Sequence, residues 1–465
     1  MQTKLFTSEF ISLRKIIIPL FMISITFTMD SCRSQAENSG NKNTDFRELS
    51  DDSLLNLVQY RTFQYFFDGA EPVSGMARER YHVDGVYPDN DMNVVTSGGT
   101  GFGVMAILTA IERKFITREE GFRLLQKIVG SLKKADRFHG AWPHWMYGET
   151  GKVKPFSQKD NGADIVETAY LMQGLLCARQ YFKDGTPEEK ALADKIDTLW
   201  KEVEWNWFTK GGENVIYWHW SPDYGWEMNF PVQGYNECLI LYVLAASSPT
   251  YPVQPEAYHE GWARSGGINT ISGKYGYTLR LKHNGAEEYG GPLFWSHYSY
   301  LGLDPRNLRD KYADYWQENV NHTLINWKWC SENPKNYKGY SENCWGLTAS
   351  YSVNFYGAHA PGEVNDLGVI SPTAALSSMP YTPAQSMNAL KHFYYKLGDK
   401  IWGKYGFYDA FSEHYKWYPQ WYLAIDQGPV VAMLENYRTG LLWKLFMSCP
   451  EIKDGLKKLG FSYGS

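Results

Sequence analysis

The feature that most constrains the fold is a series of long predicted helices, alternately amphipathic and almost wholly apolar. Residues 100–112 are small and apolar, whereas residues 117–134 carry several Arg, Glu and Lys side chains. The pair 163–183 and 187–208 repeats this contrast. A helix that is apolar all round must be enclosed, and an amphipathic helix can cover it. The pattern therefore predicts an all-α fold in which an inner ring of helices is covered by an outer ring, an (α/α)6 toroid or barrel.

The rest of the chain is less regular. Further helices are predicted from about residue 50 and over 234–246, 383–397 and 427–447. The region 250–380 is richer in Gly, Pro, Asn and aromatic residues, and its short apolar runs could be helices or strands. No sustained two-residue alternation dominates, and no βαβ pattern with a glycine-rich phosphate loop is present. Strands are therefore not needed to explain the pattern.

The amino terminus resembles an export signal. A basic start at Arg14 and Lys15 precedes an apolar stretch over 16–27, and Cys32 follows a small residue. We expect residues 1–31 to be a lipoprotein signal peptide, with Cys32 lipidated. The polar residues 32–48 are expected to be a flexible tether, and 49–465 a single catalytic domain.

This organisation predicts an exported protein, a periplasmic or outer-membrane lipoprotein. No later segment has about 18 consecutive apolar residues, so we expect contact with a membrane only through the amino-terminal lipid.

The charge and the aromatic content indicate the kind of partner. The formal net charge is −5, and Lys and Arg form no long run, which argues against nucleic acid and favours a neutral substrate. Aromatic residues make up 16% of the chain. Any single ring could simply fill the core, but an excess of this size suggests that some rings line a surface groove.

Four glycine-bearing, polar turns run directly into apolar helices, at 96–101, 161–164, 234–237 and 425–429. Three of them carry acids near a helix start, where unpaired N–H groups and the helix dipole favour carboxylates. In a toroid the inner helix starts converge on one cleft. Paired acids among aromatic faces suit the hydrolysis of carbohydrates.

Two of these acids are our candidates for the catalytic pair. Glu237 lies where a polar turn enters an apolar helix, so partial burial would raise its pKa and keep it protonated as a general acid. Asp426 lies in a turn that contains Gly428 and Pro429, and we expect the N–H groups ahead to keep it ionised as a general base. The alternatives are that Glu237 only complements the helix dipole and that Asp426 only caps its helix.

Asp164 and Glu167 form a second pair. Their spacing of three places both at the start of one helix, and like charges so close would raise one pKa. They could bind sugar hydroxyls or exchange roles with the first pair. A capping arrangement, with Asp164 as the cap, would explain the same spacing without catalysis.

Aromatic and polar residues in loops are candidates for binding substrate, because rings in such loops are harder to bury than rings in helices. The alternative for each is a purely structural role. The candidates are Trp142, His144, Trp145, Trp218, Trp220, Trp226, Arg78, Tyr381 and Trp421. No metal is expected, since neither His144 nor His219 has further ligands at a suitable spacing.

Five cysteines follow Cys32. Cys330 and Cys344 could form a disulfide in an oxidising compartment, or they could be free buried thiols. No Cys or His spacing typical of a zinc site is present.

Three stretches resemble a known family. Residues 405–411, 424–429 and 435–443 look like the glycoamylase-like domain of Bacteroidetes lipoproteins, and residues 164–168 and 235–237 match it as well. The resemblance covers roughly residues 50–460. Proteins that resemble this chain fall in glycoside hydrolase family 144. The resemblance implies an (α/α)6 barrel, an inverting mechanism, no cofactor, endo-β-1,2-glucanase activity on a neutral glucan, and support for Glu237 and Asp426 as the catalytic acids.

Three other functions remain possible from the sequence. The first is a glycosidase with glucoamylase-like or β-glucosidase-like specificity, because a pair of acids at helix starts does not encode which linkage is cut. A non-catalytic glycan-binding lipoprotein would keep the aromatic groove but not depend on the acids. A lyase for acidic polysaccharides would need a basic cleft, and the clustered acids argue against such a cleft. The sequence lacks the Gly-x-Ser-x-Gly motif that would indicate an esterase or protease.

Overall fold

The computed structural model describes residues 46, 48–284 and 288–464. The predicted signal peptide, the lipidation site Cys32 and most of the predicted tether lie outside the described residues. Residues 46–465 form one unit.

Helices account for most of the regular structure of this unit. The α-helices are α1 (Asp51–Phe67), α2 (Ser97–Glu112), α3 (Arg118–Leu132), α4 (Ile165–Phe182), α5 (Pro187–Lys201), α6 (Leu239–Ser247), α7 (Tyr315–Glu332), α8 (Pro372–Ser377), α9 (Pro383–Ile401), α10 (Ala424–Arg438), α11 (Leu441–Met447) and α12 (Pro450–Lys458). Short 3-10 or π-helical turns lie at Pro88–Asn93, Trp205–Thr209, Ala257–Trp262, Arg264–Gly266, Leu293–Ser296 and Tyr298–Tyr300.

The strands are short and form small antiparallel sheets. They are β1 (Arg80–His82), β2 (Val94–Thr96), β3 (Trp145–Tyr147), β4 (Val153–Lys154), β5 (Ala163–Asp164), β6 (His219–Trp220), β7 (Asn269–Lys274), β8 (Tyr277–Leu281), β9 (Ala349–Ser352), β10 (Phe355–Ala358), β11 (Trp402–Gly403), β12 (Gly406–Phe407) and β13 (Trp421–Leu423).

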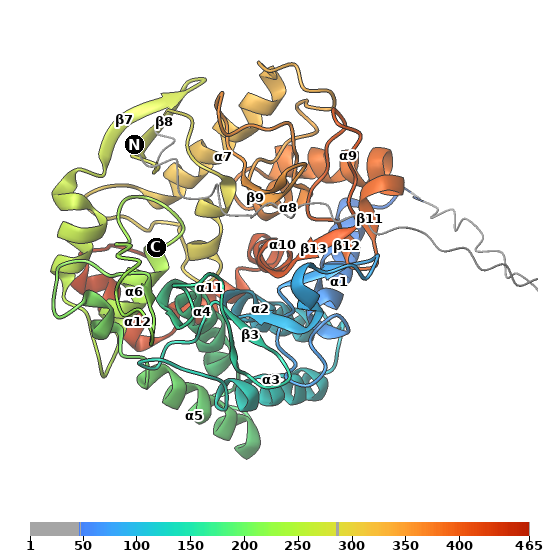
Figure 1. The fold of residues 1–465 in the computed structure, drawn as a ribbon. Coiled ribbons are helices and arrows are strands. Elements are labelled where there is room, and N and C mark those ends of the chain that lie inside the picture. The colour runs from blue at the N-terminus through green and yellow to red at the C-terminus, as the bar shows by residue number, and fades with distance from the viewer. Residues whose placement is uncertain (1–45, 47, 285–287, 465) are drawn as a thin grey trace, which may run out of the picture. The chain divides into compact units, whose positions relative to one another are not determined.

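The predicted alternation of apolar and amphipathic helices is confirmed. Every residue of α2 from Ser97 to Ile111 is buried, and α6 is buried throughout. By contrast, α3 buries only a stripe that includes Leu125, Ile128 and Leu132. In Figure 1, α2, α4, α8 and α10 lie toward the middle, and α1, α3, α5, α7 and α9 lie toward the periphery. The inner helices pack side by side in the order α8, α10, α2, α4 and α6. The outer helices α1, α3, α5 and α9 cover them.

The inner helices α2 and α4 approach each other very closely, which explains the small residues in α2. A Cβ on Gly101 would lie 2.3 Å from the carbonyl oxygen of Tyr170, and one on Gly174 would lie 2.1 Å from the carbonyl oxygen of Gly101. Only a residue without a side chain fits at either position.

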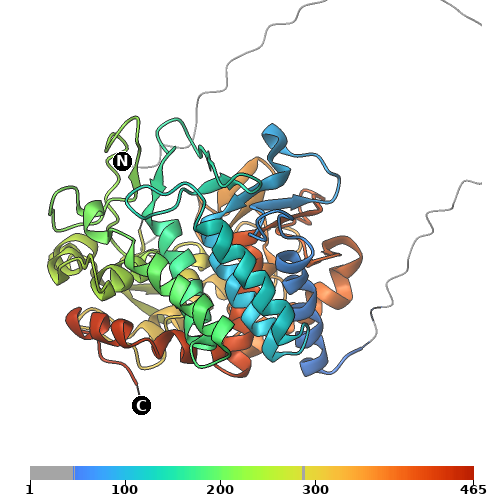
Figure 2. The same cartoon turned by 90° about the horizontal axis from the view of Figure 1, so that it is seen from below.

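Three inner helices begin directly after a short strand. β2 leads into α2, β5 into α4 and β13 into α10, and these strands pair with β3, β6 and β1. Figure 2 shows the strands and long loops of this region gathered at one end of the helices. The starts of α4 and α10, which carry Asp164, Glu167 and Asp426, therefore open toward the same end.

The boundaries differ from the prediction at three places. The helix predicted over 234–246 begins at Leu239, because Gly234 has a φ of 79° and the Asn236 side chain accepts the N–H of Cys238. The helix predicted over 427–447 is divided at Gly440, which has a φ of 69°. The helix predicted over 187–208 ends at Lys201.

The region 250–380 contains both helices and strands. Its longest element is α7, which begins where the Asp314 side chain caps the N–H of Gln317. The expectation that strands are not needed is incomplete, because short strands such as β9 and β10 shape the loops around the inner helices.

The cysteines from Cys177 to Cys449 are free and buried, including Cys330 and Cys344. The structure therefore favours the second of the two possibilities left open by the sequence.

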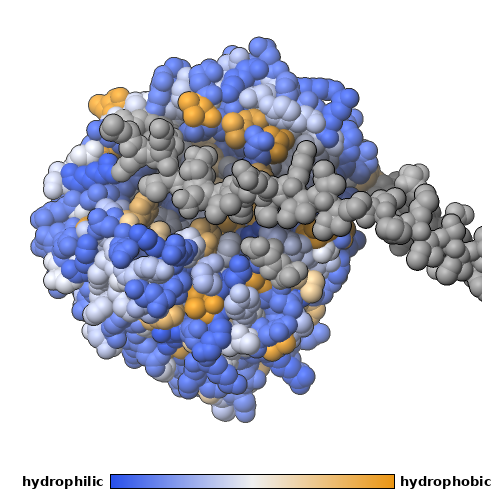
Figure 3. Space-filling model, in the orientation of Figure 1, coloured by the Kyte–Doolittle hydropathy of each residue, from blue (hydrophilic) through white to orange (hydrophobic). Residues whose placement is uncertain are grey.

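The molecular face seen in Figure 1 is mostly hydrophilic, with small separate hydrophobic patches (Figure 3). Within the described part of the chain, every helix is too short or too polar to cross a bilayer.

Candidate active site

The start of α2 touches the starts of two other inner helices. The N–H of Gly98 donates to Oε2 of Glu167 in α4 over 2.8 Å, and Thr96 donates its hydroxyl to the same oxygen over 3.3 Å. A Cβ on Gly99 would lie 2.7 Å from the Cβ of Ala424, the first residue of α10. Glycines at these positions therefore let three helix starts meet.

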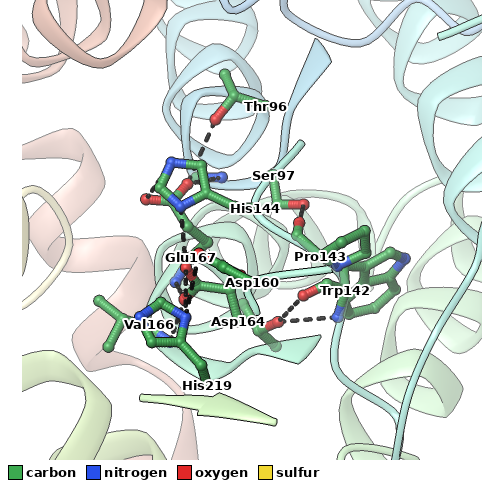
Figure 4. A network of polar contacts seen from close by, with 12 residues as sticks. Thr96, Ser97, Trp142, Pro143, His144, Asp160, Asp164, Val166, Glu167 and His219 are labelled. Carbon is green, nitrogen blue, oxygen red and sulfur yellow. Dashed lines mark hydrogen bonds and ion pairs between the residues drawn. The ribbon is translucent and has the colours of Figure 1, made fainter. Parts of the chain in front are cut away.

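Asp164 caps α4 and binds His144. Oδ1 of Asp164 accepts the N–H groups of Val166 and Glu167 over 3.0 and 2.9 Å. Its Oδ2 lies 3.0 Å from Nδ1 of His144, and Nε2 of His144 lies 4.0 Å from Oε1 of Glu167. Figure 4 shows His144 close to both acids. The capping role of Asp164 is thus present, but Glu167 accepts from α2 instead of completing a capping box.

The contacts among His144, Asp164 and Glu167 shift the pKa values of these three groups in different directions. Burial would lower the pKa of His144, but the charge of Glu167 and the hydrogen bond to Asp164 raise it to about 10. Burial would raise the pKa of Asp164, but the hydrogen bond with His144 lowers it. Burial raises the pKa of Glu167, despite the nearby positive charge of His144. The pair therefore has two unequal pKa values, chiefly because burial and His144 act differently on the two acids, and the charge of Asp164 adds to the rise at Glu167.

His144, Asp160 and Asp164 offer three possible ligand atoms within 4.8 Å of one another. His219 lies beside them, with Nδ1 3.3 Å from Oδ2 of Asp160. In the structure, His144 and Asp164 are joined by a hydrogen bond, and the expectation that no metal is bound here stays a prediction.

Glu237 lies in the turn two residues before α6 and is half-buried. Ser299 and Tyr170 donate their hydroxyls to its backbone carbonyl. Burial, with a contribution from the charge of Glu167, raises the pKa of the Glu237 carboxyl to about 7. The group is thus accessible and holds a proton close to neutral pH.

Two tyrosines connect the acids. The rings of Tyr170 and Tyr298 lie 5.6 Å apart. Burial raises the pKa of both phenols, and nearby carboxylates add to the effect, Glu237 and Glu167 at Tyr170 and Asp426 and Glu167 at Tyr298. The acids from the starts of α4, α6 and α10 therefore surround one pair of rings.

Asp426 differs from its prediction in one respect. It is the third residue of α10 and is 4% exposed, and its Oδ2 receives no hydrogen bond from any group in the described residues. Burial and the neighbouring Asp409 carboxyl raise its pKa well above the usual value. The expectation that backbone N–H groups keep Asp426 ionised is therefore wrong, because a second carboxyl occupies its surroundings.

Two of the predicted sugar-binding residues are buried. Trp142 is fully buried, its indole N–H donates to the carbonyl of Leu132, and its ring packs against Arg137. Tyr381 is 5% exposed and donates its hydroxyl to the carbonyl of Ser296. The prediction that these two rings bind substrate is wrong, because neither offers a face to solvent.

Arg78 is half-buried, and its guanidinium donates to the carbonyl of Gly69 and the side chain of Asn93. These contacts support the loop before β2, which is a structural role.

The other predicted rings are partly exposed. Trp145 packs on Phe156 with 4.6 Å between ring centroids, and Trp421 stacks on His82 at 4.8 Å. Trp218 precedes His219, whose backbone pairs with Asp164. These three residues come from strands or loops beside the acids. Trp220 and Trp226 pack against Trp207 instead.

Sequence reasoning missed several groups at this end of the molecule. Asp409 and Glu79 both raise the pKa of Asp426, and the phenol of Tyr298 faces it. Asp409 lies within the family-like stretch 405–411, which was a usable signal. Nothing near Glu79 in the sequence marks it, since it adjoins no predicted helix start.

A cavity of about 830 Å³ lies at the opposite end of α10 and is unrelated to these acids. Asp426 and Arg438 stand near opposite ends of this helix, about 18 Å apart at 1.5 Å per residue. The charged groups that line the cavity are paired, with Arg438 bound to Asp52 and Lys391 to Asp51.

Comparisons with known proteins identify relatives of this chain. A family model described as "Glycoamylase: Putative glucoamylase" matches residues 229–450. The chain is similar to the endo-β-1,2-glucanase of Chitinophaga pinensis, whose structure was solved with sophorotriose and glucose. The two are 70% identical, the match covers 90% of this chain and 99% of that one, and the TM-score is 0.89.

A second relative is the exo β-1,2-glucooligosaccharide sophorohydrolase (non-reducing end) of Parabacteroides distasonis, 46% identical over 430 residues. That match covers 88% of this chain but only 58% of the relative, so the chain spans little more than half of its length. The endo-β-1,2-glucanase of Talaromyces funiculosus, at 11% identity and a TM-score of 0.64 over 89% of this chain and 91% of that one, shares the fold. The chain therefore belongs to the glycoamylase-like proteins of glycoside hydrolase family 144.

Proposed function

We propose that this protein is an inverting glycoside hydrolase that cleaves β-1,2-linked glucan internally and releases short oligosaccharides. The observation that carries the proposal is Glu237, a half-buried carboxyl with a pKa of about 7, in the same helix-start cluster as Asp426. The similarity to the Chitinophaga pinensis enzyme over nearly the whole of both chains supports an endo mode.

In this mechanism the two acids have different tasks. Glu237 donates its proton to the glycosidic oxygen as the bond to the anomeric carbon breaks. Asp426 accepts a proton from a water molecule that attacks the opposite face of the sugar. Asp164 and Glu167, held by His144, bind sugar hydroxyls or exchange roles with these two.

The substrate surface in this proposal consists of the partly exposed rings near the acids, Trp145, Trp218 and Trp421, together with His144. Neutral rings suit a neutral glucan. The reaction needs no cofactor, since proton transfer by carboxyl groups is sufficient for it.

The proposal includes an (α/α)6 toroid as the architecture. The close packing of α8, α10, α2, α4 and α6 and the outer positions of α1, α3, α5 and α9 support it. We also propose that residues 1–31 are a lipoprotein signal peptide, that lipid on Cys32 and a tether over 32–48 hold the catalytic domain 49–465, and that the protein is exported to the periplasm or the outer membrane.

A panel of substrates tests the reaction. Purified protein is incubated with β-1,2-glucan, starch, laminarin and cellulose, and the products are separated. We expect short β-1,2-linked oligosaccharides from β-1,2-glucan alone, released first with inverted anomeric configuration. Only sophorose would indicate exo action, and products from another polymer would show a different linkage specificity.

A pair of variants distinguishes an enzyme from a glycan-binding protein. Glu237→Gln and Asp426→Asn should each reduce turnover by ~10²–10⁴-fold, because general acid–base catalysis contributes about this much. Binding of β-1,2-glucan should be nearly unchanged. Glu188→Gln is the control, since Glu188 is exposed on α5. Unchanged turnover in both variants would reject the assignment.

A further inference from the structure

Two buried carboxyl groups lie in contact without a donor between them. Asp409 is fully buried and Asp426 is 4% exposed. Neither Oδ1 of Asp409 nor Oδ2 of Asp426 receives a hydrogen bond from a donor group of the described residues. The two side chains nevertheless lie within hydrogen-bonding range of each other. Two ionised carboxylates only accept, so a single proton between them would satisfy both oxygens.

Backbone contacts hold the two groups in place. The N–H of Asp409 donates to the carbonyl of Trp421 in β13 over 2.9 Å, and its Oδ2 accepts the N–H of Tyr351 in β9 over 2.7 Å. Asp426 is fixed within α10, which follows β13 directly. The Asp409 side chain therefore cannot turn away to relieve repulsion without breaking its contact with the Tyr351 N–H.

Among the described residues, the groups that act on the pair are anionic or neutral. The Glu79 carboxylate and the hydroxyls of Tyr298, Tyr351 and Tyr356 face the pair. Arg80 on β1 is bound to Glu79, with 2.5 Å between Nε and Oε2. Two buried, unpaired negative charges in one site are costly, and retention of one proton removes most of that cost.

We propose that Asp409 is a positioning residue of the hydrolysis, which keeps one proton on the Asp409–Asp426 pair and donates it as a hydrogen bond to Asp426. This inference rests on the proposed function, in which Asp426 is the base. With Asp409 protonated, Asp426 carries the negative charge, and its carboxylate is held in one orientation.

The proton balance of the step is simple. The water oxygen bonds to the anomeric carbon and gives one proton to Asp426, while the leaving oxygen takes the Glu237 proton as its bond to carbon breaks. Asp409 keeps its own proton throughout. Release of the Asp426 proton to solvent and uptake of one by Glu237 restore the starting state.

The raised pKa values of both carboxyl groups support one proton shared by the pair. Burial raises the pKa of Asp409 to about 7, and burial with the charge of Asp409 raises that of Asp426 well above its usual value. The pair therefore holds one proton through the neutral range, and which oxygen carries it is a property of the pair.

The pH dependence of activity tests the role of Asp409. In Asp409→Asn the amide still donates to Asp426, so Asp426 titrates beside a neutral donor in both proteins, and the acidic limb of kcat/KM should stay within about half a unit of the wild type. Turnover at the optimum should stay within about tenfold of wild type, whereas Asp409→Ala, which removes the donor, should lose roughly 10²-fold. An acidic limb that moves to lower pH by about one unit or more in Asp409→Asn would overturn the proposal, because it would mean that Asp409 is ionised in the wild type.

A matched control and a second readout keep this test separate from the proposed function. Asp366→Asn alters another buried aspartate, which binds Trp329 and Tyr340 instead of a carboxyl, and should leave the limb in place. Infrared difference spectra of wild type against Asp409→Asn at neutral pH should show one additional protonated-carboxyl band in the wild type, since the band of Glu237 is common to both proteins and cancels. This holds even if the wild type fails to cleave β-1,2-glucan, and the absence of that band overturns the shared proton.

Discussion

Nδ1 of His144 lies 3.0 Å from Oδ2 of Asp164, and this contact determines the charge at the start of α4. The pKa of His144 rises to about 10 because Glu167 and Asp164 outweigh the effect of burial. An imidazolium between two carboxylates stabilises the fold and orders the acids together.

Replacement of His144 by Gln should therefore destabilise the protein by about 3 kcal/mol at pH 6, since it leaves buried carboxylates without their cation. The folded pKa lies above the usual value of 6.5, so the stabilisation is complete below pH 6.5 and is lost as pH rises through about 10. Urea unfolding at a series of pH values measures the difference in the free energy of unfolding between the wild type and His144→Gln. His414→Gln, at an exposed site, is the control, and a wild-type advantage that persists unchanged beyond pH 10 would contradict the expectation.

The pH profile of activity should reflect Glu237. A general acid must be protonated, and the pKa of Glu237 is about 7, so kcat/KM should fall as pH rises above about 7. Because the folded pKa is raised, the wild type should also lose stability relative to Glu237→Gln between about pH 4.5 and 7. Initial rates across pH test the expected fall in activity, and thermal unfolding across pH tests the expected loss of stability. A variant that is less stable than wild type at pH 8 would refute the raised pKa.

The contact between α2 and α4 should tolerate no side chain at Gly101. Gly101→Ala would place a Cβ 2.3 Å from the carbonyl oxygen of Tyr170, and such overpacking costs about 1–3 kcal/mol or more. Gly130→Ala on α3 is the matched control, because no atom lies within 4 Å of the added Cβ. It should stabilise the protein by up to about 1 kcal/mol through helix propensity. Denaturant midpoints of both variants decide the matter, and equal values would be inconsistent with the close approach.

Trp142 and Trp421 should separate stability from substrate binding. Trp142→Phe removes the indole hydrogen bond to Leu132 inside the core, so the melting temperature should fall while KM stays unchanged. Trp421→Ala removes a partly exposed ring five residues before Asp426 and should raise KM by about tenfold or more, since aromatic contacts contribute about 0.5–1.5 kcal/mol beyond their buried area. A change of KM in Trp142→Phe alone would reverse these assignments.

Removal of divalent metals should not affect the reaction. The side chains of the cluster contact one another, with Nδ1 of His144 3.0 Å from Oδ2 of Asp164, and carboxyl groups suffice for the proposed proton transfers. Dialysis against a chelator should leave the initial rate on β-1,2-glucan unchanged. A loss of rate that Ca²⁺ or Mn²⁺ restores would instead assign this cluster to a cation.

The helices and their order follow from local patterns. The apolar run of α2, the stripe of α3 and the cap at Asp164 are visible in the sequence because they depend on neighbours within one or two turns. Helix α7 was missed, since its apolar residues are mixed with Asn and His and form no clear stripe. The start of α6 was misplaced by five residues, because Gly234 adopts a left-handed conformation that no helical pattern reveals.

The site was only partly predictable. The sequence by itself determined which acids stand at helix starts, because capping and dipole effects act locally. Only the tertiary structure decided that Trp142 is buried while Trp145, three residues later, is partly exposed. It also decided that Asp409 meets Asp426 across a loop and that His144 stands between Asp164 and Glu167. Burial and pKa depend on groups that distant segments bring together, so they appear only once the helices have packed.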